Sequence, residues 1–308
     1  MLTHRVLSLW PALARERSAQ VPNVRLNLAS SPRNVLLVRQ VLAGLAEPLK
    51  LDRIEFNDVV TSVSEACNNV ALHAYPGGEG PMDVEVCASA RELRVVVRDH
   101  GRGIHAPAVG PRQSNPIGLR LIETLADSVD YLDVPRGGTE LRMSFATAGP
   151  RQLESTQEQD PLKLCATSHD DLGQATRIAI TPCMLARSIL PRVFGVLATN
   201  ADFSIDRVSD TQILIDTLVA GVERCPSAHP LEVNVRLASR SLELRLGPLR
   251  AGVGDALVRA LSGVRLIGFD VVVVCPPYVG PGQITSLLAA NLAYEMLSLA
   301  ALDRISGR

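Results

Sequence analysis

Two stretches in the first half of this chain each match a stretch in the second half, and the matches follow in the same order. Residues 49–68 (LKLDRIEFNDVVTSVSEACN) match residues 203–222 (FSIDRVSDTQILIDTLVAGV) in their apolar positions and in a shared Asp-Arg pair. Residues 82–105 (MDVEVCASARELRVVVRDHGRGIH) match residues 231–254 (LEVNVRLASRSLELRLGPLRAGVG) along their apolar positions. These matches predict an internal repeat of domain size. A length of 308 residues is enough for two domains of about 150 residues, so the repeat predicts two units of one architecture.

Strand-like and helix-like patterns follow one another along the first unit. Apolar and polar residues alternate in the expected strands, and apolar residues recur every three to four positions in the expected helices. The expected elements are a strand at 24–29, a helix over 32–49, a helix capped by Asp52 or Asn57 that runs through 61–76, strands at 82–89 and 92–99, a helix at 118–127 and a last hairpin of VDYLDVP and TELRMSFA. This order predicts an α+β fold, a two-layer sandwich of helices on a mostly antiparallel mixed sheet.

The composition changes at three places and predicts the domain boundaries. Residues 1–22 are expected to be an N-terminal leader that lacks the apolar segment and cleavage site of a signal peptide. The first domain is expected at 23–146. Residues 147–172 are polar and without periodicity, which predicts a linker. The second domain is expected at 173–308 and includes a final helix at 284–305.

Composition and charge exclude some classes of partner. Hydrophobic residues make up 46% of the chain and charged residues 20%, which supplies a large core and argues against disorder. The net charge of −1 leaves no basic excess to neutralise phosphates, so nucleic acid is not expected as the main partner. Aromatic residues are only 3%, too few for the stacking surfaces of single-strand binders.

The cysteines and the apolar runs predict the compartment. The six cysteines are scattered, without a CxxC pair or a Cys/His cluster at metal spacing. We therefore expect buried thiols in a reducing cytoplasm. No apolar run reaches the roughly 20 residues that a membrane span needs without Gly, Pro or charge. A cytoplasmic protein without a membrane partner is expected.

Glu65 and Asn69 lie four residues apart in the helix expected through 61–76. This spacing places both polar side chains on one face, while Val63, Ala66 and Val70 belong to the face that can pack on a sheet. A carboxylate and an amide in this arrangement suit a proton acceptor beside a metal ligand. The same spacing is also common on solvated helices, so it does not identify a site by itself.

Two further motifs follow before residue 140. The strand at 92–99 ends in Asp99-His100-Gly101-Arg102-Gly103, a D-x-G-x-G pattern that is also typical of a tight turn. Residues 104–117 are rich in Pro, Gly, Ser and Asn and are expected to form a mobile loop. The helix GLRLIETLAD and the sequence GGTEL, which contains Thr139, come next. Each motif alone is weak, but the set in this order is specific.

Together these motifs resemble those of the GHKL ATPases, which have the Bergerat or histidine-kinase-like fold. Within that group the chain looks closest to the small bacterial anti-sigma factor serine/threonine kinases. The resemblance covers residues 24–146, and a degenerate copy is expected over 175–275. It implies that SEACNN is the N box, DHGRGI the first glycine box and PIGLRLIETLAD the second.

The resemblance also implies a role for each matching residue. Glu65 matches the proposed general base. Asn69 matches the ligand of the Mg²⁺ ion that bridges the ATP phosphates. Asp99 matches the acceptor for the adenine amino group, and Thr139 matches the threonine that supports this contact. The remaining residues are expected to bind ATP through backbone that approaches it closely: Gly101, Gly103, Gly118 and Leu119.

The chain departs from the family's pattern where the loop meets the helix. The loop at 104–117 corresponds to the ATP lid, which usually ends in Gly-x-Gly, and here Pro116-Ile117-Gly118 stands in its place. Proline has no N–H and a fixed φ. We therefore expect one phosphate contact to be lost and the lid to be stiffer, which weakens ATP binding or transfer.

The second unit keeps the apolar residues of the first and lacks its polar ones. Val219 stands at the position of Glu65, Glu223 at that of Asn69 and Pro248 at that of Asp99. The resemblance implies that such domains pair, as a homodimer or, here, as a pseudo-dimer within one chain. We expect the second unit to be that partner or a docking surface.

Other polar residues of the first unit are better explained without chemistry. The expected explanations are helix-end packing for His73 and Tyr75, loop solvation for His100 and His105, and simple exposure for Arg102 and Arg112.

Two functions from different classes remain open. The resemblance implies an ATP- and Mg²⁺-dependent serine/threonine kinase that phosphorylates a STAS-type anti-sigma antagonist, binds a sigma factor and so regulates transcription. The alternative is a non-catalytic nucleotide-binding or partner-sequestering module, which Pro116 and the second unit favour. A histidine-kinase fragment is less consistent with the chain, because no phosphoacceptor helix precedes the ATPase half. Gyrase-like and mismatch-repair ATPases would need a transducer domain.

Overall fold

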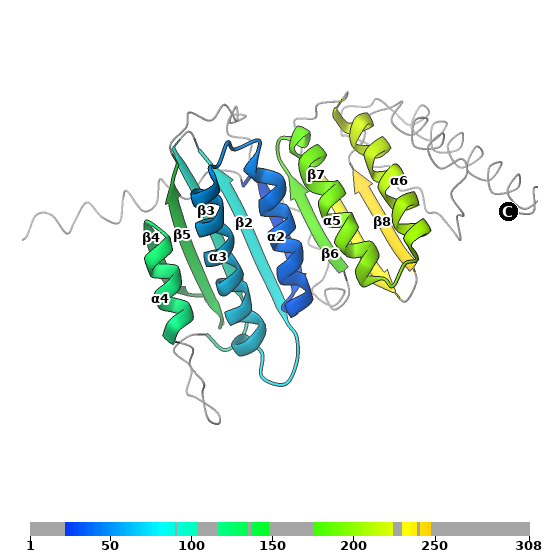
Figure 1. Cartoon of the computed structure of the whole chain (residues 1–308). Helices are drawn as coiled ribbons and strands as arrows, with labels where there is room; N and C mark the ends of the chain where they lie inside the picture. The colour runs from blue at the N-terminus through cyan, green and yellow to red at the C-terminus, as the bar shows by residue number, and fades with distance from the viewer. Residues whose placement is uncertain are drawn as a thin grey trace, which may run out of the picture.

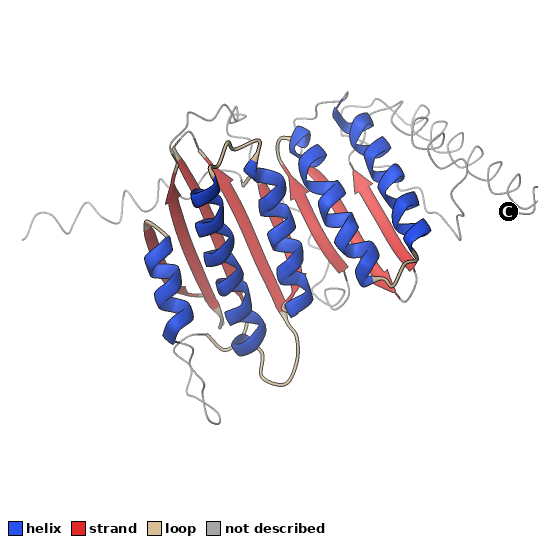
Figure 2. Cartoon of the chain, in the orientation of Figure 1, coloured by secondary structure: helices blue, strands red, loops and turns tan. Residues whose placement is uncertain are grey.

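The computed structural model describes residues 22–89, 91–103, 116–134, 137–147, 175–223, 230–238 and 241–247. They form two layers, an eight-stranded sheet and a row of helices that covers one of its faces (Figures 1 and 2). The strand order is β4-β5-β3-β2-β1-β6-β7-β8. The expected α+β layering is confirmed. Each neighbouring pair of described strands is antiparallel, so the sheet over these residues is not mixed.

The first half of the chain supplies five strands and three helices of this arrangement. In chain order they are β1 (Val24–Ala29), α2 (Pro32–Ala46), α3 (Arg53–Asn69), β2 (Pro81–Ala88), β3 (Glu92–Asp99), α4 (Pro116–Leu125), β4 (Ser128–Asp133) and β5 (Thr139–Ala146). Both expected hairpins, β2 with β3 and β4 with β5, are present. The sheet places β5 beside β3, which brings the two glycine-containing turns of the first half together.

Helix α3 begins with a capping box. The Asp52 carboxylate accepts hydrogen bonds from the N–H groups of Ile54 and Glu55, at 2.7 and 2.8 Å. In return the Glu55 carboxylate accepts from the N–H of Asp52 at 2.9 Å. Such a box satisfies backbone donors that the first turn of a helix leaves without partners. Asp52, and not Asn57, is therefore the cap.

The end of α3 departs from regular helix. Val70–Ala74 form a π-helical turn, and Tyr75 after it has extended backbone angles. Turns of this kind are rare and occur often at functional sites. The Ala74 carbonyl accepts a hydrogen bond from the N–H of Arg102 at 3.2 Å. The π-helical turn thus brings the end of α3 against the segment that follows β3.

Apolar residues on one face of the strands pack under the helices and form the core. On β1 these are Val24, Leu26 and Leu28, each nearly inaccessible to solvent. The thiols of Cys67, Cys87 and Cys183 are free and buried, as expected for these three. Burial raises the pKa of Cys67 to about 12, so this thiol stays protonated and chemically quiet.

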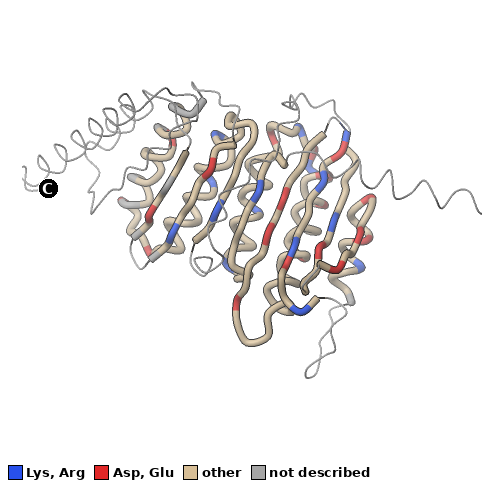
Figure 3. Tube along the Cα trace, turned by 180° about the vertical axis from the view of Figure 1, so that it is seen from behind, with Lys and Arg blue, Asp and Glu red and all other residues tan. Residues whose placement is uncertain are grey.

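The opposite face of the sheet is polar. Seen from behind, the strands carry acidic and basic residues side by side (Figure 3). Arg25 on β1 pairs with Glu85 on β2 at 2.9 Å. Glu140 on β5 pairs with both Arg98 and Arg142. Burial alone would raise the pKa of Glu140, but its hydrogen bonds and proximity to the two guanidinium groups outweigh this and lower it.

The second half repeats the order of the first and extends the same sheet. Its elements are β6 (Ala175–Ile180), a 3-10 turn (Cys183–Leu185), α5 (Ala186–Asn200), α6 (Ile205–Glu223), β7 (Leu231–Ala238) and β8 (Ser241–Gly247). This is the order of β1, α2, α3, β2 and β3. Strand β6 pairs with β1, so the described strands of both halves form one sheet.

The other expectations about organisation are not tested by the described residues. The domain boundaries at 22/23, 146/147 and 172/173 stay predictions, and the helix expected at 284–305 lies outside the described residues. Within the described part of the chain, none of the helices combines the length and the apolar character needed to cross a membrane.

Candidate functional site

The carboxylate of Glu65 lies at the start of α4. Glu65 projects from α3, and Gly118 is a buried residue in the first turn of α4. A methyl group added at Gly118 would lie 2.8 Å from Cδ of Glu65 and still closer to its carboxylate oxygen Oε1. Only a residue without a side chain leaves this room. The structure therefore brings together the expected base and the expected phosphate-binding helix start.

Asn69, one turn after Glu65, has a buried amide nitrogen without a hydrogen-bond partner among the described residues. Leaving such a donor unpaired costs about 1–3 kcal/mol, so a buried amide of this kind commonly belongs to a binding site. The same side chain carries an amide oxygen, which is a ligand type that Mg²⁺ accepts. The side chain thus offers both a donor for phosphate and a ligand for a cation.

The residues present fit a magnesium ion held mainly by its nucleotide. Within the described residues no group of three or more His, Cys, Asp or Glu side chains is placed to hold a metal ion. Mg²⁺ usually takes one or two protein oxygens and leaves its other positions to water and phosphate. A single Asn69, one turn after the Glu65 that contacts the start of α4, matches that pattern.

Asp99 forms the other side of the site. It is the last residue of β3 and only 4% exposed. Its carboxylate accepts a hydrogen bond from the N–H of Gly101 at 2.8 Å, and also from the backbone and the hydroxyl of Thr139. Burial raises the pKa of Asp99, and these donors offset only part of the effect. A buried carboxylate with its donors on one side suits recognition of an amino group on the other.

Glycines let the backbone approach closely around Asp99. A methyl group at Gly101 would clash with the Ala74 carbonyl, and one at Gly138 would lie 2.8 Å from the carbonyl carbon of Asp99. Gly103 has a φ of +78°, a conformation that favours glycine. The turn after β3 and the start of β5 are thus in direct backbone contact, and this contact places Thr139 beside Asp99.

The structure brings the expected site residues into two groups. Glu65 and Gly118 lie where α3 meets the start of α4, and Asn69 follows one turn after Glu65 at the end of α3. Asp99, Gly101, Gly103 and Thr139 lie where β3 meets β5. The side chain of Leu119 is partly buried and packs against the core, so its backbone is the part that we expect to contact a ligand. Helix α4 begins at Pro116, inside the loop expected at 104–117. Residues 104–115 of the expected lid, including His105 and Arg112, lie outside the described residues.

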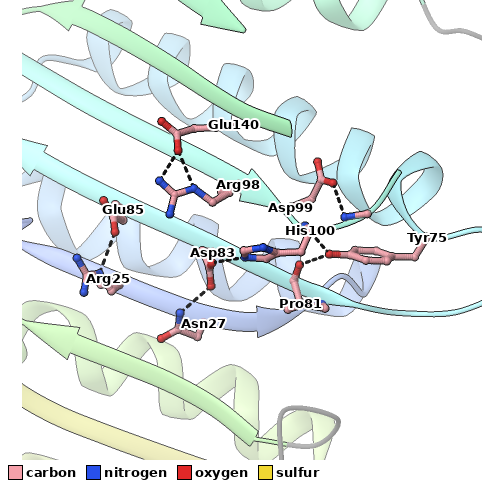
Figure 4. A network of polar contacts seen from close by, with 11 residues as sticks. Arg25, Asn27, Tyr75, Pro81, Asp83, Glu85, Arg98, Asp99, His100 and Glu140 are labelled. Atoms are coloured by element: carbon pink, nitrogen blue, oxygen red, sulfur yellow. Dashed lines mark hydrogen bonds and ion pairs between the residues drawn. The ribbon is translucent and has the colours of Figure 1, made fainter. Parts of the chain in front are cut away.

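Two residues interpreted as packing and loop solvation make specific contacts beside Asp99 (Figure 4). The Tyr75 hydroxyl accepts a hydrogen bond from the backbone N–H of His100 at 2.8 Å and donates one to the Pro81 carbonyl at 2.5 Å. The His100 ring lies 3.0 Å from the Asp83 carboxylate, which also accepts a hydrogen bond from Asn27. No sequence pattern predicts these contacts, because the partners come from different elements.

Comparisons with known proteins agree with this geometry. Residues 28–145 match the family model of the histidine kinase-like ATPase domain. The anti-sigma F factor of Clostridium kluyveri is 29% identical over 130 residues, which is 39% of this chain and 92% of that protein. The anti-sigma F factor of Thermoanaerobacter sp. (strain X514) is 28% identical over 130 residues, with 39% and 91% covered. The serine-protein kinase RsbW of Bacillus velezensis is 29% identical over 126 residues, with 36% and 79% covered.

These similarities concern the first half of the chain. Residues 28–145 match the histidine kinase-like ATPase domain, and this part of the chain is distantly similar to anti-sigma F factors and to a serine-protein kinase. The resemblance expected from the motifs is confirmed at this level. An ATPase domain of this class implies ATP binding, and the residues described above lie within the matched range.

Proposed function

We propose that the first half is an ATP- and Mg²⁺-dependent serine/threonine kinase that phosphorylates a STAS-type antagonist of an anti-sigma factor in the cytoplasm. The observation that carries the proposal is the contact between Glu65 and Gly118, which puts a carboxylate at the helix start where phosphate would lie. The distant similarity to a serine-protein kinase and to anti-sigma F factors supports the same reading. A sigma factor is the second partner in this proposal.

Each residue has one task in the proposed reaction. Asp99, held by Gly101 and Thr139, accepts the adenine amino group. The first turn of α4 directs backbone N–H groups at the phosphates. Asn69 would hold the magnesium ion, and the charge of that ion would neutralise the phosphate oxygens. Glu65 takes the proton of the substrate hydroxyl as that oxygen bonds to the γ-phosphorus and ADP leaves.

Because of Pro116 we expect a lower rate of phosphoryl transfer from this site. It stands at the first position of α4 and offers no N–H to a phosphate. A proline is well tolerated there for the helix itself, because the first N–H groups of a helix have no partner within it. The chain thus keeps the helix and gives up one donor. Pro116→Gly is expected to bind Mg-ATP more tightly than the natural chain.

We further propose that the second half is a degenerate copy of the first and acts as its partner in a pseudo-dimer. In the pairing of β1 with β6, Leu26 lies opposite Ile178. Leu26 also pairs with Val84, and Ile178 pairs with Val233, the residue that the repeat aligns with Val84. Equivalent residues therefore meet at the centre, as in a two-fold interface between identical subunits.

The pseudo-dimer predicts the mass of the protein in solution. The edge of β1 that a second copy would need is already paired with β6. Light scattering on the full chain should give the monomer mass. A homodimer joined through β1 would contradict this part of the proposal.

The alternative function is a binding module without catalysis. Its motivation is Pro116 and a second half in which Val219 replaces the expected base. Such a module would bind a nucleotide, or none, and act by holding its partner. Calorimetry with Mg-ATP separates the cases in part, because a protein that binds no nucleotide leaves only this alternative.

The direct test uses labelled ATP, Mg²⁺ and the candidate antagonist. We expect label on a serine or threonine of the antagonist. Glu65→Ala should keep Mg-ATP binding and lose transfer, because only the proton acceptor is removed. Asn69→Ala should weaken Mg-ATP binding itself. An unlabelled antagonist beside an active control kinase would reject the kinase and favour the binding module.

A further inference from the structure

The Tyr75 hydroxyl joins three elements at the edge of the candidate site. The residue directly follows the π-helical turn at the end of α3, so its backbone belongs to the segment that carries Glu65 and Asn69. The hydroxyl accepts from the N–H of His100, the residue after Asp99, and donates to the carbonyl of Pro81, the first residue of β2. Figure 4 shows the ring reaching between the two backbones.

The ring of Tyr75 is held as firmly as its hydroxyl. Its side chain packs against the hydrophobic core, and a methyl group at Gly80 would lie only 2.5 Å from the ring atom that bears the hydroxyl. Gly80 is itself tied to Ser30 through its N–H at 2.9 Å and its carbonyl at 2.8 Å. The ring thus rests on a short segment that is fixed to the start of α2, so the hydroxyl has little freedom to leave its two partners.

Other contacts join the same two segments. The Arg102 N–H donates to the Ala74 carbonyl at 3.2 Å, and Gly101 lies so close to that carbonyl that a methyl group would not fit. The turn over 99–103 is therefore attached to the end of α3 at His100 by a side chain and at Arg102 by backbone. The Arg102 side chain also donates from Nε to the His73 carbonyl, at the longer distance of 3.4 Å. The Tyr75 hydroxyl is the side-chain attachment next to Asp99, and Tyr75→Phe removes it while leaving the backbone intact.

From these contacts we propose that Tyr75 is a positioning residue of the nucleotide site. Its hydroxyl fixes the adenine-recognising turn of Asp99 relative to the helix of Glu65 and Asn69, and so sets the spacing between base recognition and phosphate binding. The inference rests on the proposed function, because it assigns Asp99 to the adenine. It differs from simple helix-end packing, which needs the ring of Tyr75 and not its hydroxyl.

The hydroxyl keeps this role over the physiological pH range. Burial raises the pKa of Tyr75 to about 12, while the hydrogen bond from His100 acts in the opposite direction. The proton that bonds to the Pro81 carbonyl is therefore present throughout the physiological pH range. The contact behaves as a fixed structural link and not as a pH switch.

The test compares Tyr75→Phe with Tyr131→Phe. Both substitutions remove one phenolic oxygen and keep the ring. The Tyr131 hydroxyl on β4 is buried and has no partner among the described residues, so its removal breaks no hydrogen bond. Thermal unfolding confirms that each variant is folded. Two measurements follow, the exchange rate of the His100 amide by NMR and the dissociation constants for Mg-ATP and Mg-GTP.

We expect Tyr75→Phe to speed exchange of the His100 amide at least tenfold and to weaken Mg-ATP binding by roughly twofold to tenfold, the range for one hydrogen bond. Mg-GTP binding should change less, so the preference for ATP falls. Tyr131→Phe should alter neither quantity. Faster exchange without a change in the ATP preference would overturn the inference, because the hydroxyl would then be structural only.

Failure of the proposed function gives a different result. A natural chain that binds no Mg-ATP overturns that function and this inference with it. A natural chain that binds Mg-ATP, with a Tyr75→Phe variant that prefers ATP equally well, overturns this inference alone. If the variant does not fold, the exchange rate of the His100 amide in the natural chain still tests the link through Tyr75. It should exchange at least tenfold more slowly than in an unstructured peptide of the same sequence, and exchange at the peptide rate would refute the link.

Discussion

At Gly118 the absence of one methyl group decides whether Glu65 can reach the start of α4. An added methyl group would lie 2.8 and 3.0 Å from the side-chain carbons Cδ and Cγ of Glu65. A flexible side chain gives way more easily than a helix, so in Gly118→Ala the carboxylate of Glu65 should move aside. Because general-base catalysis typically contributes 10²–10⁴ in rate, we expect transfer to the antagonist to fall at least about tenfold. Single-turnover assays at saturating Mg-ATP measure this loss.

Gly195→Ala on α5 is the matched control for that change. A methyl group there meets no atom within 4 Å, and alanine stabilises a helix relative to glycine by roughly 0.5–1 kcal/mol. The control should be at least as stable as the natural chain and transfer phosphate equally fast. Equal transfer rates in the two variants would mean that the contact between Glu65 and Gly118 has no role in catalysis.

Asp99 should make the unliganded protein less stable as the pH rises. Burial raises the pKa of its carboxyl, so between about pH 4, the ordinary value, and the raised value the folded state binds more protons than the unfolded state. The free energy of unfolding therefore falls through this window. Asp99→Asn removes the titration, and its stability relative to the natural chain should increase from pH 4 to pH 7 in urea unfolding. A difference in stability between Asp99→Asn and the natural chain that does not change with pH would contradict the raised pKa of Asp99.

The site residues were predictable from the sequence to different degrees. Glu65, Asn69 and Asp99 could be found because each lies in a short motif with fixed spacing. Tyr75 could not, because its hydroxyl bonds to the backbone of His100 and Pro81, and any residue type offers a carbonyl. The residue type of the partner does not reveal a contact that is made to its backbone. His100 is exposed, as expected, but its contact with Asp83 was not predictable for a related reason, since Asp83 reaches it only through the pairing of β2 with β3.

At the scale of elements, α2 and α5 meet through a glycine. A methyl group at Gly44 on α2 would lie 2.6 Å from the Ser188 carbonyl oxygen and 2.8 Å from Cα of Ile189, both on α5. These are backbone atoms, so the two helices would have to separate. Gly44→Ala should lower the free energy of unfolding by about 1–3 kcal/mol, the range for overpacked cores, as measured by urea unfolding. Unchanged or higher stability, as expected for Gly195→Ala, would show that the helices are not in close contact.

Local patterns predicted the helices and strands, but features that depend on long-range contacts could not be predicted from them. The alternation in β2 and β3 and the proline at the start of α2 depend on neighbouring residues alone. The capping box at Asp52 is equally local, although the sequence left Asn57 open as an alternative. The π-helical turn at Val70–Ala74 was not predicted, because its apolar residues fit an ordinary helix equally well. What distinguishes it is the Arg102 N–H on the Ala74 carbonyl, a contact across the fold.

At the scale of the whole molecule, the candidate site lies in the first half, and the second half covers the edge of the first half's sheet. Every residue of the site lies between Glu65 and Thr139, while β6 covers the free edge of β1. An unpaired edge strand is a template for pairing with another chain. The internal repeat predicted two units of one architecture, but not that they would share a sheet. That depends on β1 and β6 meeting, which no local pattern encodes.

Removing the second half should therefore make the first half associate with itself. A fragment of residues 1–147 exposes the edge of β1 and the surface of α2 that contacts α5, including Gly44. Because the β1–β6 pairing is nearly two-fold, a second β1 strand can take the place of β6, and the fragment should form a dimer while the full chain stays monomeric. Light scattering at several concentrations measures both. A folded fragment that stays monomeric would show that the β1 edge is not an interface, and that the second half has another role.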